Sequence, residues 1–568
     1  MVNKADSNYS STDAKSRFSP VDGHFSLHRS IDWTGAFWVA SGVAALVLFS
    51  MGAITATVGK PAWIVWIISI SFGFIQAFTY AEIAGLFPHK SGGTSVYGAV
   101  AWINYSKLIP PLSIWCNWIA WAPVLAIGSG LAAGYILTTL FPADAVINTW
   151  QITLLDLSFL KADLTLRVNA TFIVGATLMI IVFAIQNGGI LRSAKATMIL
   201  GLSSLIPLLL LALIPILTGD MPSEHFFPLK PLAFDDNGYV IDGDWDLNGW
   251  ILLAGGLFIA AWSTYAFETA VCYTREFKNP RTDTFKAILF SGLLCLIAFT
   301  LIPLAFQGHL GLGDLVQMET LDSSGSVVSP AVYNGMLASE IYSGMGVAKA
   351  LSGILGGSAI LMNFFVVMLV LALLLPIMTA MSGSSRTLYQ GAVDGLLPKY
   401  LSHVNDNGAP TRAMWTNLVV NLLLLSLSDY VFLLAASNVS YIIFNFLNLN
   451  AGWIHRIDRP QWDRPYRAPN ILMAIGGVLA FVNLALMALG ANIWGAGTLI
   501  SGFIVAALII PIFCWRHYVV DKGKFPKAML DDMKLGGEAK AEKRAGALPY
   551  IVLVAGVMTI AVIRYAIS

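Results

Sequence analysis

The stretch GWILLAGGLFIAAWSTYAFETAVCY, residues 249–273, decides the class of fold. It is long and apolar enough to cross a lipid bilayer, which takes about 20 mainly apolar residues. Two features interrupt it: the pair Gly255-Gly256, and the run Ser263-Thr264-Tyr265 followed by Glu268. An ionisable side chain at membrane depth is costly and usually marks an ion or substrate path. The stretch therefore predicts a broken membrane-spanning helix that carries a functional acid.

Runs of the same kind recur along the whole chain. Of its 568 residues, 57% are hydrophobic and 11% are charged, whereas an ordinary soluble domain holds about a quarter charged residues. Lipid offers the backbone no hydrogen-bond partners, so such runs must form helices. The sequence predicts an all-α integral membrane protein. With 249–273 the runs number thirteen, the others being 35–57, 62–86, 112–140, 170–186, 196–217, 287–306, 346–381, 412–428, 430–453, 471–490, 493–515 and 548–567.

Lysine and arginine fall mostly on one side of this predicted topology. With the N-terminal segment placed in the cytoplasm, 27 of the 33 Lys and Arg lie in inner segments. Cytoplasmic loops of membrane proteins carry such an excess. We expect the N-terminus inside and, after thirteen spans, the C-terminus outside. The net charge of +1 gives no indication of a nucleic-acid partner.

The chain is expected to divide into four parts. These are a polar cytoplasmic tail at 1–32, a domain of twelve spans at 33–517, a mixed-charge cytoplasmic linker at 518–547 and a thirteenth helix at 548–568. The tail lacks the apolar stretch of a signal peptide. The four cysteines match neither a metal-site spacing nor a disulfide framework. No catalytic pattern or nucleotide-binding loop is visible, so neither an enzyme nor a resident cofactor is expected.

Two acids lie at membrane depth. Glu268 sits deep in its run, whereas Glu82 lies near the inner end of run 62–86. Two interpretations of Glu82 stay open: a hydrated gate residue, or a helix-end carboxylate paired with a loop cation. Glu268 is the candidate for coupling to substrate or proton.

A second interrupted run lies five runs earlier. Run 35–57 contains Ser41-Gly42 and Ser50-Met51-Gly52. Broken helices at corresponding positions of two inverted repeats form the binding site of many secondary transporters. The spacing is the one that an inverted five-plus-five repeat requires.

Four motifs then carry a family resemblance. They are YAEIAGLFPHKSGGTSVYGAVAW at 80–102, YAFETAVCYTREFKNPRTDTFKAI at 265–288, SSRTLYQGAVDGLLPKYLSHVNDNGAPTRA at 384–413 and DRPYRAP at 463–469. In this order, on the predicted cytoplasmic side, they resemble the motifs of amino acid–polyamine–organocation (APC) superfamily permeases. The resemblance covers residues 27–515 and leaves the thirteenth helix unaccounted for.

The resemblance implies a fold and a substrate site. The fold is a five-plus-five inverted-repeat (LeuT-like) bundle of twelve helices, in which the first and sixth are unwound midway. Substrate lies against those breaks, where helix dipoles and freed backbone groups hold it. The residues so assigned to substrate are Ala44, Val47, Leu48, Trp121, Trp262, Ser263, Thr264, Tyr265 and Ser437, with Glu268 for the proton.

Two departures from the family affect the expected chemistry. Ungapped alignment puts Leu46-Val47-Leu48 where the family has Gly-Ser-Gly, and the alternative register uses Ala40-Ser41-Gly42. The bulky residues would crowd a substrate carboxylate, which favours recognition through an amine or by shape. In run 196–217, Ser203 and Ser204 stand where proton-coupled relatives carry a lysine. Coupling is then left to a proton at Glu268, or to sodium on the carbonyl of Ala44 with Thr379 and Ser382.

Three further groups of residues each have two interpretations that stay open. Trp115, Asn117, Trp118 and Trp121 form either an aromatic wall for a cationic amine or ordinary interfacial and core packing. The stripe Ser437, Asn438, Ser440, Tyr441 and Asn445 either lines a cavity or bonds neighbouring helices. The acids of the predicted outer loop before run 249–273 either concentrate cations or reflect the scarcity of Lys and Arg outside.

The sequence thus predicts a multi-pass secondary transporter for an amino acid or a related organic amine. Proton-coupled uptake is the expected mode, in a plasma membrane such as the bacterial inner membrane. The alternatives are an amino acid/amine antiporter and a polyamine or guanidino-compound transporter, with sodium as a possible coupling ion. A membrane sensor that keeps the fold without transport is disfavoured, because no extra-membrane signalling domain is visible.

Overall fold

A computed structural model describes residues 27–142, 145–321, 327–329, 331–342, 346–355, 357–533 and 543–567. Most of the predicted tail at 1–32, and part of the predicted linker at 518–547, lie outside these ranges. The described chain is mostly helical and has little sheet, which confirms the predicted all-α class.

The first six predicted runs all form helices. They are α2–α4 (Trp33–Ala40, Gly42–Ala45, Val47–Val58), α5 (Ala62–Gly85), α7 and α8 (Ile109–Trp121, Pro123–Leu140), α10 (Ala170–Gln186), α11 and α12 (Ile190–Leu200, Ile206–Thr218) and α13 (Leu247–Thr264). The other seven contain α14 (Pro280–Leu310), α17 (Ala359–Val393), α18 (Thr411–Leu425), α19 (Tyr430–Asp458), α20 (Asn470–Gly490), α21 and α22 (Thr498–Ala507, Ile509–Cys514) and α24 (Leu548–Ile567).

Eleven helical stretches in the described ranges are long and apolar enough to cross a membrane. The two other predicted spans are shorter helices: α10 has 17 residues and α18 has 15. One predicted boundary was wrong, because run 346–381 is split into α16 (Val347–Ile354) and α17. Gly357 takes a positive φ of 74°, and the Ser358 side chain then caps α17 by accepting from the Leu361 N–H. The span itself begins at Ala359 and continues to Val393.

Short elements lie in the connections between spans or within the spans themselves. The remaining α-helices are α6 (Thr94–Trp102), α9 (Val146–Thr149), α15 (Ser339–Tyr342) and α23 (Lys527–Met533). The 3₁₀ and π segments are η2 (Gly201–Leu205), η3 (Ser223–His225), η4 (Ala266–Glu276), η5 (Gly335–Leu337), η6 (Lys399–Ser402), η7 (Ala491–Trp494) and η8 (Trp515–Val520). Of these, η2, η4, η7 and η8 lie within spans. Four antiparallel pairs join β1 (Gln151–Asp156) with β2 (Thr165–Asn169), β3 (Leu232–Phe234) with β4 (Val240–Asp242), β5 (Leu315–Gln317) with β8 (Val332–Tyr333), and β6 (Thr320–Leu321) with β7 (Val327–Ser329).

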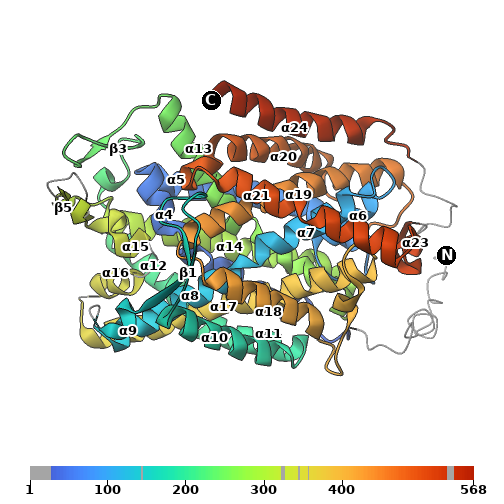
Figure 1. Ribbon diagram of the computed structural model, residues 1–568, viewed down its shortest axis with the longest axis horizontal. Helices are drawn as coiled ribbons and strands as arrows, with labels where there is room; N and C mark the ends of the chain where they lie inside the picture. Colours follow the sequence, from blue (N-terminus) through green and yellow to red (C-terminus); the bar gives the residue numbers. More distant parts are fainter. Residues whose placement is uncertain are drawn as a thin grey trace, which may run out of the picture.

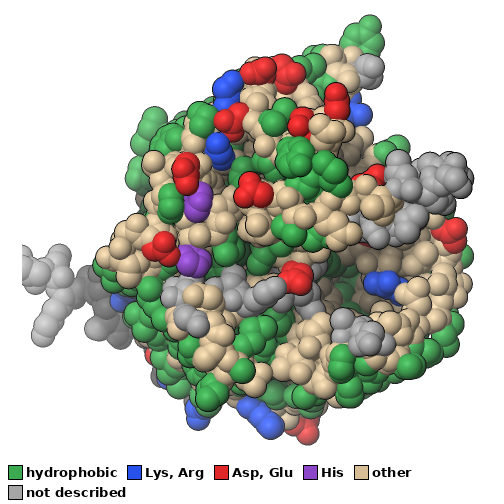
Figure 2. Space-filling view, turned by 90° about the vertical axis from the view of Figure 1, so that its left-hand side faces the viewer, with side chains coloured by type: hydrophobic (Ala, Val, Ile, Leu, Met, Phe, Trp, Pro, Cys, Tyr) green, Lys and Arg blue, Asp and Glu red, His purple; other side chains and the backbone are tan. Residues whose placement is uncertain are grey.

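The hairpins gather at one end of the bundle (Figure 1), which we call the hairpin end. The helix α23 lies at the opposite end, beside Lys90. We call this the basic end, because the segments predicted to carry most of the Lys and Arg lie there. Asp and Glu are spread over the hairpin end, with few Lys or Arg among them (Figure 2). A cavity of about 620 Å³ lies there, lined by His225, His309 and the Lys60–Asp242 ion pair among others. The loops that carry the four family motifs lie at the basic end, where His89 contacts Asp532 of α23, Lys90 pairs with Asp394 and Arg281 pairs with Asp463.

The packing follows the order of an inverted repeat. The second span, α5, packs on the seventh, α14, and the third span, α7–α8, packs on the eighth, α17. In the first and sixth spans, α4 packs on α13 and α2 on η4, so opposite halves of the two helices meet. The first three spans therefore each pack on the span five later, an arrangement consistent with a five-plus-five repeat. The thirteenth helix, α24, packs on α20 at the edge of the bundle (Figure 1).

The first span differs from the unwound helix that the resemblance implied. Its two interruptions, Ser41 and Leu46, keep right-handed helical angles, with φ −61° and ψ −23° and with φ −62° and ψ −17°. Tight turns bridge them, because Ala44 N–H donates to the Ser41 carbonyl and Phe49 N–H to the Leu46 carbonyl. A bulky apolar residue such as Leu46 favours helical backbone angles, because only glycine adopts left-handed or strained conformations at little cost.

Gly42 in this span allows a close helix contact. A Cβ there would lie 2.4 Å from the Leu375 carbonyl carbon of α17. We expect Gly42→Ala to lower the melting temperature in detergent, because rigid backbone cannot yield as a flexible side chain can. The matched control is Gly477→Ala in α20, where a Cβ meets nothing within 4 Å. That variant should be neutral or stabilising, and equal melting temperatures for the two variants would contradict the packing role of Gly42.

Candidate functional site

The sixth span changes helix type at Tyr265. The α-helix α13 ends at Thr264, and after Tyr265 the 11 residues Ala266–Glu276 form the 3₁₀ helix η4. Runs of 3₁₀ helix longer than three or four residues are uncommon and often mark a functional hinge. The break falls in the Ser263–Glu268 segment where the sequence predicted an interruption.

Glu268 lies in the first turn of η4 and is 1% exposed. Its carboxylate accepts two hydrogen bonds from neutral donors. Trp121 Nε1 of α7 is 3.2 Å from Oε1, and Thr94 Oγ1 of α6 is 3.1 Å from Oε2. None of the ion pairs between described residues includes Glu268. A buried carboxylate without a cation is costly, so this group is suited to a positively charged ligand or a proton.

Glu82 is satisfied differently. Its carboxylate accepts from Arg456, with Nε 2.8 Å from Oε1, from Arg464 Nε at 3.1 Å and from the Ala468 N–H at 2.8 Å. These partners correspond to the helix-end pair, one of the two interpretations of Glu82. The ion pairs tie α5 to α19 and to the loop after it at the basic end, so a gate role for Glu82 stays a prediction.

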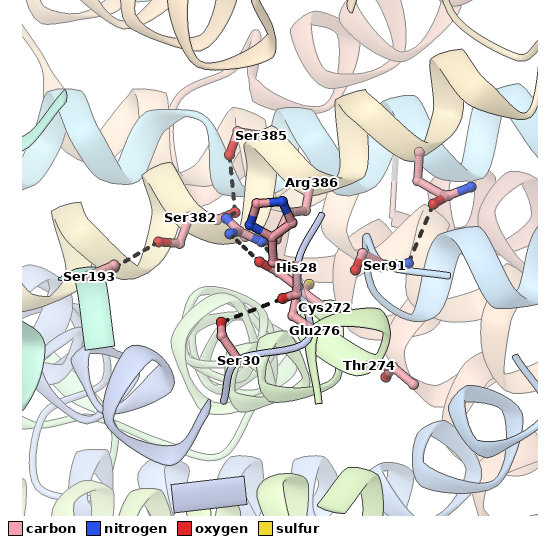
Figure 3. A network of polar contacts seen from close by, with 12 residues as sticks. His28, Ser30, Ser91, Ser193, Cys272, Thr274, Glu276, Ser382, Ser385 and Arg386 are labelled. Atoms are coloured by element: carbon pink, nitrogen blue, oxygen red, sulfur yellow. Dashed lines mark hydrogen bonds and ion pairs between the residues drawn. The ribbon is translucent and has the colours of Figure 1, made fainter. Parts of the chain in front are cut away.

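A third buried acid, Glu276, ends η4 and pairs with Arg386 of α17. Arg386 Nη2 is 2.9 Å from Glu276 Oε1, and Nε donates to Oε2. Figure 3 shows this pair, with Ser382, whose carbonyl accepts from Arg386 Nη1 at 2.9 Å. The backbone carbonyl of Glu276 also accepts from the Ser30 N–H at 3.0 Å. Of these three acids, only Glu268 has no basic partner within the described chain.

The Ser91-Gly92-Gly93 turn brings Thr94 to Glu268. Gly92 and Gly93 take positive φ values of 107° and 87°, which favour glycine. A Cβ on Gly93 would lie 2.7 Å from Cys272 Sγ, and Gly92 N–H donates to the Cys272 carbonyl at 2.9 Å. Thr387 Oγ1 of α17 donates to the Gly92 carbonyl at 2.8 Å. The turn is thus held between η4 and α17.

Aromatic rings surround the break. The Trp262 ring lies 6.1 Å from that of Phe49, and Trp262 Nε1 donates to the Ala120 carbonyl, next to Trp121. Trp115 and Trp118 are oriented to other helices, since their Nε1 atoms donate to the Val505 carbonyl and to Asn417 Oδ1. Of the predicted aromatic wall, Trp121 contacts Glu268 directly.

The other predicted site hydroxyls bond mainly within the protein framework. Ser263 and Thr264 donate to the Ala260 carbonyl, and Ser437 donates to the Leu434 carbonyl of its own helix. Thr264 also lies 2.7 Å from Ser69 Oγ of α5. Tyr265 Oη donates to Asn483 Oδ1 at 2.9 Å, so it ties the break to α20.

The predicted positions of the first span are buried beside these groups. Ala44 and Val47 are 0% exposed and Leu48 is 5% exposed. Of the sodium candidates, Thr379 Oγ1 donates to the Val39 carbonyl at 2.5 Å and Ser382 Oγ to Gln186 Oε1 at 2.6 Å, and the sodium site stays a prediction. Thr379 therefore bonds the first span five residues before Ala44.

Sequence reasoning missed Thr94 near Glu268, and it left the roles of Asn117 and Tyr441 open. Thr94 follows the Ser-Gly-Gly motif directly, a position that was a usable signal. Tyr441 has its ring 6.3 Å from Tyr265, and Asn117 Oδ1 accepts from Thr387 Oγ1 at 3.2 Å. The Tyr441 hydroxyl and Asn117 Nδ2 are buried with no hydrogen-bond partner in the described chain. Both residues stood in polar patterns noted above, but their proximity to the break depends on the fold.

A bundle of apolar helices with inverted-repeat packing, broken beside a buried acid, defines a multi-pass membrane transporter and not an enzyme. Residues 31–514 match the amino acid permease family, and the chain belongs to this family. It is also similar to the polyamine transporter PUT1 of Oryza sativa subsp. japonica, with 23% identity over 446 residues, or 76% of this chain and 70% of that protein.

Proposed function

We propose that the protein carries an amino acid or a related organic amine by alternating access, with Glu268 binding the ammonium group. The observation that carries the proposal is the Glu268 carboxylate, which is buried, held by two neutral donors and without a basic partner among the described residues. An ammonium group supplies the charge that this carboxylate lacks.

Two features of the surroundings favour recognition through an amine. Indole and phenol faces attract cations, and Trp121, Trp262 and Tyr265 lie at the break. At Leu46-Val47-Leu48 the first span offers no glycine to a substrate carboxylate, and the backbone there stays in a tight helical conformation. The similarity to a protein named a polyamine transporter supports a polyamine or guanidino compound as the second candidate.

Proton coupling is the mode that fits Glu268 best. A buried carboxylate without a basic partner readily takes up a proton, so a change in the protonation of Glu268 can accompany the binding and release of substrate. Ser203 and Ser204 of the fifth span donate to carbonyls of their own helix. Sodium coupling through Ala44, Thr379 and Ser382 is the alternative ion, and exchange of an amino acid against an amine is the alternative mode.

We further propose that the basic end faces the cytoplasm, in a plasma membrane such as the bacterial inner membrane. Of the chain's 33 Lys and Arg, 27 lie in segments predicted at that end, and cytoplasmic loops carry such an excess. The N-terminus then lies inside and α24 ends outside.

Uptake into liposomes that hold the purified protein tests the transport proposal. Amino acids, polyamines and guanidino compounds are compared with and without an imposed proton or sodium gradient. We expect saturable uptake of an amine that an inward proton gradient accelerates. A preference for zwitterionic α-amino acids over simple amines would overturn amine recognition, and uptake that requires sodium would overturn proton coupling.

A further inference from the structure

The segment after the twelfth span folds back onto the basic end, beyond the residues that match the permease family. Its short helix α23 (Lys527–Met533) buries Met529 completely and Asp532 to 3% exposure. Asp532 contacts two consecutive residues of the loop after α5, His89 and Lys90. Its Oδ2 lies 2.6 Å from Lys90 Nζ, and its Oδ1 lies 2.5 Å from His89 Nε2.

Lys90 joins this segment to the eighth span. Its Nζ is also 2.7 Å from Oδ2 of Asp394, which directly follows α17. Burial by itself would lower the pKa of Lys90, but Asp394 and Asp532 outweigh burial and raise it. The Lys90 ammonium in turn outweighs burial at Asp532 and lowers the pKa of that carboxyl. The Lys90–Asp532 pair is therefore charged at neutral pH.

The backbone fits closely where the segment arrives. Gly395 has a φ of 76°, and a Cβ there would lie 2.4 Å from Cδ of Pro526. Asp521 N–H donates to the Arg516 carbonyl at 3.0 Å, and Gly523 N–H to the His517 carbonyl at 2.7 Å. These contacts direct the chain back toward the loop of Lys90.

Lys90 and Thr94 belong to one short turn. Between them, Gly92 binds the Cys272 carbonyl of η4 on one side and Thr387 of α17 on the other. Thr94 then donates to Glu268. The turn 89–94 thus connects the docked C-terminal segment to the buried carboxylate through a run of six residues.

We propose that residues 521–533 form a latch that keeps the basic end closed. Docking of Asp532 on Lys90 holds the turn 89–94 against η4 and α17, where it covers Cys272 and Glu268. Release of the latch frees the turn, which opens the path from the basic end to the site. The inference goes beyond the proposed function and depends neither on the substrate nor on the coupling ion.

The accessibility of the Cys272 thiol measures whether the turn 89–94 is closed, and the measurement needs no substrate. It is buried behind Gly93, so the rate of its reaction with a thiol reagent measures the opening of the turn. The test uses the full chain in liposomes with the other three cysteines replaced. We expect Asp532→Asn to raise the labelling rate of Cys272 several-fold. The matched control is Asp531→Asn, which removes an exposed carboxylate from the same helix and should leave the rate unchanged.

A second single-cysteine background separates opening from unfolding. Cys295, buried in α14, should keep its slow labelling in Asp532→Asn. Faster labelling of Cys272 alone supports the latch. An unchanged rate at Cys272, an equal rise in Asp531→Asn, or a parallel rise at Cys295 would each overturn it.

Discussion

Replacing Glu268 by glutamine should abolish most amine uptake. The side chain keeps its size, its amide oxygen can still accept from Trp121 and its NH2 can donate to the Thr94 hydroxyl, but it loses the charge that faces the ammonium group. Removing one partner of a buried charge pair costs about 3–5 kcal/mol, which corresponds to a roughly 100-fold or larger loss of uptake at limiting substrate. Initial uptake rates in liposomes measure the effect.

Asp236→Asn is the matched control, because it neutralises an exposed acid of the loop between β3 and β4. Trp121→Phe removes one donor to Glu268 but keeps the negative charge, so it should reduce uptake less than Glu268→Gln. Melting temperatures of all three variants are measured together. Uptake by a folded Glu268→Gln variant equal to that of the original protein would contradict the proposed role of Glu268.

Arg386→Gln should cause the largest loss of stability. It leaves the Glu276 carboxylate, which is 0% exposed, without its bidentate partner. An uncompensated buried charge of this kind lowers the free energy of unfolding by about 3–5 kcal/mol. The midpoint of thermal unfolding in detergent should fall markedly.

Two further variants make this expectation specific. Glu276→Gln combined with Arg386→Gln should recover part of the loss, since neither buried charge then stays alone. Arg281→Gln breaks an exposed pair, in which the side chains of Arg281 and Asp463 are each 67% exposed, and should cost about 1 kcal/mol or less. A fall in midpoint for Arg281→Gln equal to that for Arg386→Gln would contradict the role of burial.

Most of the fold followed from local composition. Lipid forces every long apolar run into a helix, so all thirteen predicted runs contain helices and Ala170–Gln186 even has the predicted bounds. Run 346–381 was placed wrongly because its first part is apolar enough to continue the span. The glycine turn before Ser358 breaks it, and the true span extends into the polar Ser384–Ala392 segment. That segment is buried because other helices cover it, and composition alone does not show this.

Only the site residues that lie close together in the sequence could be predicted. Glu268 and the Ser263–Tyr265 break belong to one run, so both were visible in the sequence. The contact of Thr94 with Glu268 joins residues 174 positions apart, and Arg386 meets Glu276 across 110 positions. The motifs contained all four residues, but no local spacing pairs them. The first span differs in another way. The family resemblance implied an unwound helix there, but Leu46-Val47-Leu48 keeps a helical backbone.

The 3₁₀ conformation of η4 also affects the length of the sixth span. A 3₁₀ helix rises about 2.0 Å per residue and an α-helix about 1.5 Å, so these 11 residues span about 5 Å more than they would as α-helix. The two forms also differ by about 20° of rotation per residue, which amounts to about 60° between Tyr265 and Glu268. A change of helix type over η4 alone would therefore shorten the sixth span and turn the Glu268 carboxylate away from Trp121 and Thr94, with no rigid-body movement of the other spans.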